Sequence, residues 1–288
     1  MPLNKHCIGK QYPPVEAAVT LEAIQNYARA YDHDNPFFFD SERPGGIVAP
    51  PMFGVVPIWQ SIVKVVTDPE VGADLLRLVH GEHEVEFIAP IRPSDVITSL
   101  ASIRSITAGA TGETMAIAVG ARNQRGESVQ NTVFTAFIRT AGGGRSETDG
   151  REGEAQRGEP AAAMTQEIAA DQTFRYAQAS GDVNPIHLDA NIAKMAGLPG
   201  IIVHGLCTMA FCSKAVIETV CGGDPLRLRR LRVRFVRPVL PGQTITTRIW
   251  PLRETAAGKE FEFETVNQNG RAVIRGGLAE VIGTAKRN

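Results

Sequence analysis

The residues best suited to chemistry lie in one short stretch, Gly181-Asp182-Val-Asn184-Pro185-Ile-His187. Pro185 has no backbone N–H and a fixed φ, so the stretch is predicted to be a loop or tight turn. Gly181 permits a sharp turn of the backbone beside Asp182. A carboxylate and an imidazole held on one rigid loop can share a single water molecule. The pattern therefore indicates general acid–base chemistry by Asp182 and His187.

A second candidate lies at the start of a long apolar segment, where His204-Gly205 precedes Leu206 to Val220. The segment is predicted to be a helix, and the first N–H groups of a helix have no partner within it. The helix macrodipole adds partial positive charge at that end. The Gly205 N–H is therefore a candidate donor to an oxygen that gains negative charge. The alternative is a glycine that serves only backbone freedom.

The longer pattern around these residues resembles the signature of the MaoC-like, R-specific enoyl-CoA hydratases (hydratase 2). The matching positions are Tyr176, Ser180, Gly181, Asp182, Asn184, Pro185, Ile186, His187, His204 and Gly205. A motif of this length is a specific signal. The resemblance implies that Asp182 and His187 form the catalytic pair, that Asn184 orients them, and that the Gly205 N–H binds the thioester oxygen. Asn184 also suits a simpler role as a turn residue, and the two roles are compatible.

The first half of the chain contains an altered copy of the same pattern. Aligned on its Asn35-Pro36, the copy places Tyr27 on Tyr176. It follows a segment with helical spacing, Leu21 to Tyr31, for which Thr20 is the expected N-cap. Later landmarks recur in the same order in both halves, which indicates two tandem copies of one fold.

The altered copy lacks the groups that the proposed chemistry needs. His33 falls on the position of Asp182, and Phe38 falls on that of His187. The first half is therefore predicted to contribute no chemistry. Its Phe37-Phe38-Phe39 run is a candidate lining for an apolar space that takes an acyl tail, with core packing as the alternative.

Each half is predicted to contain a long apolar helix, Met52 to Val66 in the first and Leu206 to Val220 in the second, followed by about four amphipathic strands. Such a helix needs a sheet wrapped around it. The resemblance implies an α+β double hotdog, two antiparallel sheets each wrapped around a central helix. Residues 141–162 are rich in glycine and charge and are predicted to be a flexible linker between a repeat at 1–140 and a repeat at 163–288.

Composition excludes several classes of function. The formal net charge of −1 gives no electrostatic case for nucleic acid. No apolar stretch is long enough to span a bilayer, and no signal peptide is visible, so a cytoplasmic enzyme is predicted. The four cysteines lack zinc spacing, and His80 and His83 have no third ligand nearby. No metal or redox cofactor is expected, and coenzyme A enters only as part of the substrate.

One cluster of arginines has two interpretations. On the segment that ends at Phe235, arginines alternate with apolar residues, so one face is cationic and the other apolar. The cationic face is either a solvated sheet surface or a site for the phosphates of coenzyme A. The cluster contains Arg227, Arg229, Arg230, Arg232, Arg234 and Arg237.

The resemblance implies reversible hydration of a trans-2-enoyl-CoA to the (R)-3-hydroxyacyl-CoA. Within the family, the alternative is a dehydratase that acts on an acyl-carrier-protein thioester or a small branched diacid-CoA. A non-catalytic acyl-CoA-binding hotdog protein and a thioesterase are alternatives from other classes. The sequence leaves open the acyl chain length, the physiological direction and whether two chains associate as a homodimer.

Overall fold

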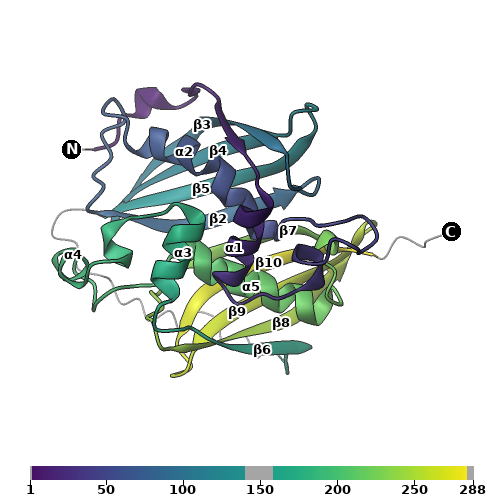
Figure 1. Ribbon diagram of the computed structural model, residues 1–288. Helices are drawn as coiled ribbons and strands as arrows, with labels where there is room; N and C mark the ends of the chain where they lie inside the picture. The colour runs from purple at the N-terminus through teal and green to yellow at the C-terminus, as the bar shows by residue number, and fades with distance from the viewer. Residues whose placement is uncertain (1, 140–157, 284–288) are drawn as a thin grey trace.

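The structure, a computed structural model, describes residues 2–139 and 158–283, and its elements form two similar sets (Figure 1). The first set comprises β1 (Val15–Ala18), α1 (Leu21–Arg29), α2 (Val55–Val66), β2 (Leu78–Phe87), β3 (Val96–Gly109), β4 (Gly112–Arg122) and β5 (Ser128–Arg139). The second comprises β6 (Ala162–Glu167), α3 (Gln172–Ser180), α4 (Ala190–Met195), α5 (Gly205–Val220), β7 (Leu228–Phe235), β8 (Thr244–Glu254), β9 (Gly258–Asn267) and β10 (Ala272–Ile282). Short 3₁₀ turns lie between them at Lys5–Cys7, Pro36–Phe38, Pro51–Gly54, Pro185–His187 and Pro225–Arg227.

All ten strands form one antiparallel sheet in the order β1-β3-β4-β5-β2-β7-β10-β9-β8-β6. Counted from each edge inward, the two halves have the same order, and they join where β2 pairs with β7. A pseudo-two-fold axis therefore passes between these central strands, as expected for two copies of one fold. Each half holds five strands where about four were expected from sequence patterns, because the edge strands β1 and β6 are short and precede the helices.

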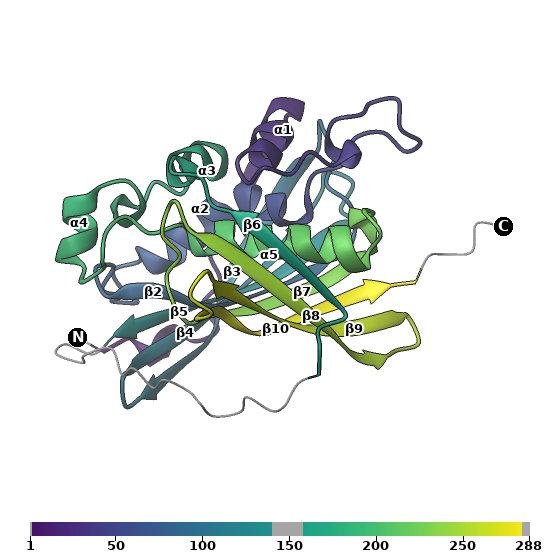
Figure 2. The ribbon, with the colours of Figure 1, turned by 90° about the horizontal axis from the view of Figure 1, so that it is seen from below.

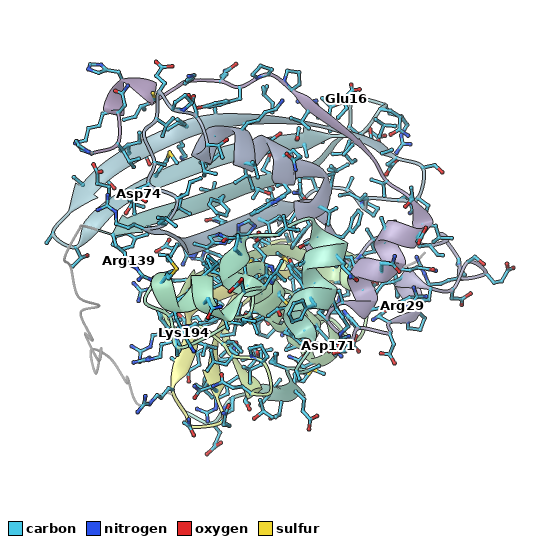
Figure 3. The ribbon with its side chains drawn as sticks, turned by 60° about the vertical axis from the view of Figure 1, so that its left-hand side comes forward. Glu16, Arg29, Asp74, Arg139, Asp171 and Lys194 are labelled. Carbon is cyan, nitrogen blue, oxygen red and sulfur yellow. The ribbon has the colours of Figure 1, made fainter. Side chains whose placement is uncertain are left out.

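The helices lie on one side of this sheet (Figure 2), and buried side chains fill the space between them (Figure 3). The long helix α5 is buried on nearly all sides, which explains its almost continuous apolar sequence. The first-half helix differs from its prediction, because residues Pro51–Gly54 form a 3₁₀ turn and α2 begins at Val55. Pro57 has no N–H for the Phe53 carbonyl, and the Gln130 side chain donates to the Gly54 carbonyl (3.1 Å).

The outer face of the sheet carries opposite charges along the β2–β7 seam. Glu82 lies opposite Arg234, and Glu84 lies opposite Arg232. The Arg230 guanidinium also forms an ion pair with Glu84. Opposite charges on facing strands stabilise the pairing modestly. These contacts favour the interpretation of this arginine face as a solvated surface.

The predicted linker lies largely outside the described residues, which resume at residue 158, and β6 already begins at Ala162. The division into repeats at 1–140 and 163–288 stays a prediction. None of the helices within residues 2–139 and 158–283 is long and apolar enough to cross a membrane.

Two equivalent tyrosines meet at the pseudo-two-fold axis. Tyr27 of α1 and Tyr176 of α3 are almost fully buried, and their hydroxyl oxygens lie 3.1 Å apart. Equivalent residues of two repeats can touch each other only close to the axis that relates the repeats. This contact therefore fixes how α1 and α3 dock.

We expect Tyr27→Phe and Tyr176→Phe each to lower the free energy of unfolding by about 1–3 kcal/mol, because each leaves one buried hydroxyl unpaired. The double variant removes both hydroxyls, so its loss should fall about 1 kcal/mol short of the summed single losses. Urea unfolding measures the four proteins. As a control, Tyr12→Phe removes a hydroxyl that donates to Asp68 (2.8 Å) and should combine additively with Tyr176→Phe. Additive losses for Tyr27 and Tyr176 would contradict the contact.

Candidate active site

The loop that holds Asp182 is built by local backbone chemistry. Helix α3 ends at Ser180, and Gly181 caps it in the left-handed conformation (φ 76°). The Asn184 side chain then accepts from the Ile186 N–H (3.3 Å), and Pro185 begins the 3₁₀ turn Pro185–His187. The prediction of a tight turn is confirmed. The turn places Asp182 and His187 on one short, well-capped segment.

Hydrogen bonds hold Asp182 on both sides. One carboxylate oxygen, Oδ1, accepts from the Asn184 N–H (3.2 Å), and the Asp182 N–H donates to the Ser180 hydroxyl (3.2 Å). The Asp182 carbonyl accepts from the Nε2–H of His204 (2.9 Å), the N-cap residue of α5. This last bond ties the loop to the start of the central helix.

His187 is buried, and its tautomer follows from its partner. Its Nδ1 lies 2.8 Å from the Ile202 carbonyl oxygen, which can only accept, so Nδ1 carries the proton. In the neutral ring, Nε2 is then a free acceptor. The ring stacks on His204 with centroids 3.8 Å apart. His187 therefore offers a lone pair and not a proton to a neighbouring water.

Burial sets the protonation of all three groups. It raises the pKa of Asp182 above its usual 3.8, with His187 opposing, and lowers the pKa of His187 below 6.5, with Asp182 opposing. Burial lowers the pKa of His204 to about 3. The pKa values of Asp182 and His187 thus approach each other, as suits proton transfer, and His204 is neutral at neutral pH.

Gly205 is the first residue of α5, and within the described residues its N–H has no hydrogen-bond partner. Its φ is not positive, so backbone freedom does not explain this glycine. The reason is packing, since an added Cβ would lie 3.3 Å from two ring atoms of Phe235. The glycine lets the Phe235 ring pack closely against the helix start.

The predicted site residues Asp182 and His187 thus lie together with His204, and Gly205 follows His204 directly as the first residue of α5. Asn184 is exposed, and its side chain caps the turn. The contact between Asn184 and the carboxylate of Asp182 comes from the Asn184 backbone. Its turn role is therefore visible, and a role of its side chain in catalysis stays a prediction.

Within the part of the chain that the structure describes, Asp182, His187 and His204 are also the residues most suited to hold a cation. Their donor atoms lie within 4.8 Å of one another. Carboxylate and imidazole are common ligands of transition metals. One nitrogen of each histidine is already engaged by a backbone carbonyl. The absence of a metal requirement stays a prediction.

In the first half, the equivalent residues serve the fold. His33 is buried and neutral, because burial lowers its pKa, and its Nε2–H donates to Glu218 of α5 (2.9 Å). Its Nδ1 lies 3.1 Å from the Tyr31 hydroxyl. Phe38 is fully buried and packs edge-on against His33, so it is core and does not line an acyl space.

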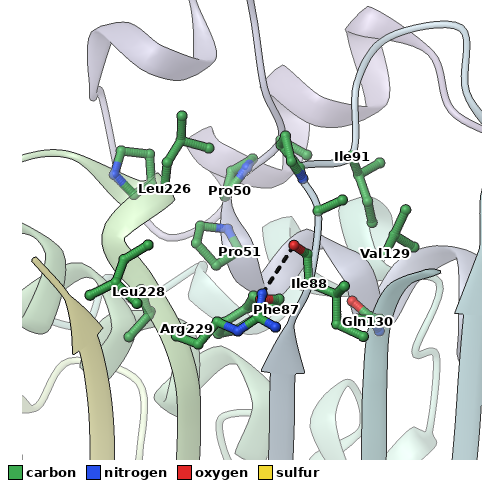
Figure 4. A pocket seen from close by; sticks show the side chains of 15 residues that line it. Pro50, Pro51, Phe87, Ile88, Ile91, Val129, Gln130, Leu226, Leu228 and Arg229 are labelled. Atoms are coloured by element: carbon green, nitrogen blue, oxygen red, sulfur yellow. Dashed lines mark hydrogen bonds between the residues drawn. The ribbon is translucent and has the colours of Figure 1, made fainter. Parts of the chain in front are cut away.

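The first half has also lost its N–H donor, a signal that the sequence analysis missed. Pro50 and Pro51 stand where the second half has His204 and Gly205, and proline has no N–H. A mostly apolar cavity of about 200 Å³ lies beside them (Figure 4). Its lining includes Pro50, Pro51, Phe87, Ile91, Val129, Leu228 and Arg229, and does not include Phe37–Phe39.

Two fused repeats, of which only the second keeps a complete acid–base loop, define a double-hotdog protein with one candidate active site. Residues 149–270 match the "MaoC like domain", and residues 6–132 match the "FAS1-like, dehydratase domain region". The chain is 30% identical to the probable enoyl-CoA hydratase 2 of Dictyostelium discoideum over 282 residues, 96% of this chain and 95% of that protein. It belongs to the MaoC-like dehydratase family, and the prediction of an enzyme of the hydratase and dehydratase class is confirmed.

Solved structures confirm the fold. The MaoC-like dehydratase from Phytophthora capsici is similar with a TM-score of 0.80 and 26% identity, over 98% of this chain and 100% of that one. A Mycobacterium tuberculosis protein described as a double hotdog has a TM-score of 0.62 and 11% identity, over 95% of this chain and 96% of that one. The chain spans only 32% of the mouse peroxisomal multifunctional enzyme type 2, with 27% identity over 81% of this chain.

We expect His33→Ala to leave kcat within a few-fold of the parent, because His33 supports the fold and touches no proposed catalytic group. The free energy of unfolding should fall by about 1–3 kcal/mol, since Tyr31 and Glu218 lose their partner. The exposed His6→Ala is the control and should change neither value. Loss of turnover in a folded His33→Ala protein would show that the first half takes part in catalysis.

Proposed function

We propose that this protein adds water reversibly across the C2–C3 double bond of a trans-2-enoyl-CoA to give the (R)-3-hydroxyacyl-CoA. The observation that carries the proposal is the meeting of three groups at the start of α5. These are a raised-pKa carboxylate (Asp182), a neutral imidazole with a free Nε2 (His187) and an unpaired N–H (Gly205). The name of the Dictyostelium relative supports the same reaction.

The dyad handles the protons of one water. Asp182 takes one proton from the water while the water oxygen attacks C3. Nε2 of His187 accepts a hydrogen bond from the other hydrogen of the water. The Asp182–His187 pair then delivers one proton to C2. Hydroxyl adds to C3, hydrogen adds to C2, and both side chains return to their starting state. Positioned acid–base groups of this kind contribute about 10²–10⁴ in rate.

The Gly205 N–H stabilises the charge that builds on the thioester oxygen. It lies at a helix N-terminus, where the macrodipole favours negative charge. A fixed donor of this kind contributes about 10²–10³ in rate. Because Phe235 packs against Gly205, the donor cannot shift easily when the charge develops.

The carrier of the acyl group defines the second candidate function. The Mycobacterium tuberculosis relative named 3-hydroxyacyl-thioester dehydratase Y is 30% identical over 216 residues, and its name leaves the carrier open. The same site would serve an acyl-carrier-protein thioester. Parallel assays of one acyl group on both carriers distinguish the two candidate functions.

A cytoplasmic location and a homodimer stay predictions, and several relatives are named peroxisomal.

Asp182→Asn keeps the shape of the side chain and removes the base, and His187→Gln removes the imidazole. Each should lower kcat for enoyl-CoA hydration by about 100-fold or more in a folded protein. Loss of enoyl absorbance measures the rate. Asp189→Asn is the matched control, because it makes the same change at an exposed helix cap of the same loop and should keep full activity. Turnover near the parent's in either dyad variant would exclude this mechanism.

The proposal also fixes the product's configuration. Hydration of crotonyl-CoA, or of a longer enoyl-CoA if that is refused, should give the (R)-3-hydroxy product. An S-specific hydroxyacyl-CoA dehydrogenase coupled to the reaction should then give no signal, whereas an R-specific one should. Strong coupling to the S-specific enzyme would place the protein in another class. Release of free thiol in the same assay would instead indicate a thioesterase.

A further inference from the structure

Strand β2 carries two histidines that the proposed mechanism does not use. His80 and His83 lie three residues apart, yet their rings contact each other at 5.2 Å. A β-bulge at Gly81 explains this, because the pairing with β5 steps from His80 directly to Glu82. The extra residue turns both histidines to the inner face of the sheet, and bulges often re-aim side chains beside active sites.

Both rings have a nitrogen that is buried without a hydrogen-bond partner within residues 2–139 and 158–283. These atoms are Nε2 of His80 and Nδ1 of His83. Burial lowers the pKa of His83 to about 3 and holds that of His80 well below its usual 6.5, so both rings are neutral. An unpaired buried polar atom costs about 1–3 kcal/mol. Such atoms usually meet a water or a ligand.

His80 lies one aromatic ring away from the proposed oxyanion donor. Its ring centroid is 4.7 Å from that of Phe235, and Phe235 packs against Gly205. On its other side, His80 stacks on Phe134 at 4.0 Å. These aromatic surroundings fit the acyl part of a thioester better than the phosphates of coenzyme A.

The cavity beside Pro51 provides an internal comparison for the position of His80. With Phe87 aligned on Phe235, His80 corresponds to Leu228 and Gly81 to Arg229. Leu228 lines the cavity beside Pro51, together with Phe87 and Arg229 (Figure 4). The pseudo-two-fold axis therefore places His80 in the wall of the corresponding space beside Gly205. The space beside Gly205 thus has the imidazole of His80 where the cavity beside Pro51 has Leu228, and it has Gly81 where Arg229 narrows that cavity.

We propose that His80 is a specificity residue that binds a hydroxyl group on the acyl chain of the substrate, beyond the reacting double bond. The proposal rests on the proposed function, which places the thioester oxygen at Gly205. A hydroxyl both donates and accepts, so it pairs with Nε2 in either tautomer of the ring. A neutral ring gives no ion pair to a carboxylate, so an uncharged oxygen is the better fit.

The test compares substrates that differ only in this oxygen. 6-Hydroxyhex-2-enoyl-CoA and hept-2-enoyl-CoA have equal chain length, and the homologues with the hydroxyl one carbon nearer or farther complete the series. For the best-placed hydroxyl, the parent should prefer the hydroxylated substrate in kcat/KM by about 10-fold or more. His80→Leu, which installs the residue found at the equivalent position of the cavity beside Pro51, should abolish this preference. His80→Gln, which keeps a polar donor and acceptor, should retain part of it, and the exposed His6→Leu should keep all of it.

The outcomes separate the two proposals. If the parent turns over both members of each pair equally at all three hydroxyl positions, the role of His80 is wrong and the hydratase proposal stands. This comparison needs no variant, so it holds even if His80→Leu fails to fold. An unchanged preference in folded His80→Leu also excludes His80. If no enoyl-CoA is turned over, the hydratase proposal fails, and equal binding of the paired acyl-CoAs by calorimetry would then exclude His80 as well.

Discussion

The hydrogen bond from His204 to the Asp182 carbonyl joins the signature loop to the first turn of α5. The same imidazole stacks on His187 and lies beside Tyr176, which meets Tyr27 at the pseudo-two-fold axis. One ring therefore sets the spacing between the carboxylate, the second imidazole and the helix N-terminus. Burial keeps that ring neutral, with a pKa of about 3.

The first half shows what the same framework does without this arrangement. Its His33 is held by Glu218, and two prolines replace the histidine and glycine at its helix start. The start of α2 also differs from that of α5, because a 3₁₀ turn precedes α2 and the Gln130 side chain donates to the Gly54 carbonyl. The polar residues that remain there dock one repeat on the other. The residues that stand in place of the Asp–His pair and its turn in this copy thus also supply contacts between the copies.

Local chemistry made much of this predictable from sequence. Thr20 caps α1 and accepts from the Ala23 N–H, and the Pro185 turn follows from backbone rules. Long-range packing was not predictable in the same way. Phe38 faces the core because of His33, and Gly205 is a glycine because of Phe235, contacts that no spacing pattern encodes. The contact between His80 and His83 could not be predicted, because a bulge breaks the alternation by which residues of a strand are assigned to its two faces.

The pairing of β2 with β7 within a single chain has a genetic consequence. In a dimer of identical chains, a single codon would encode the position that Gly81 and Arg229 occupy here. A substitution that widened one cavity would then widen the other as well. Fusion doubles the number of independent positions around the axis. One side of the axis can then have His80 and Gly81 while the equivalent positions on the other side are Leu228 and Arg229. Substitutions on β2 can therefore change the surroundings of Gly205 without changing the cavity beside Pro51 on the other side of the axis.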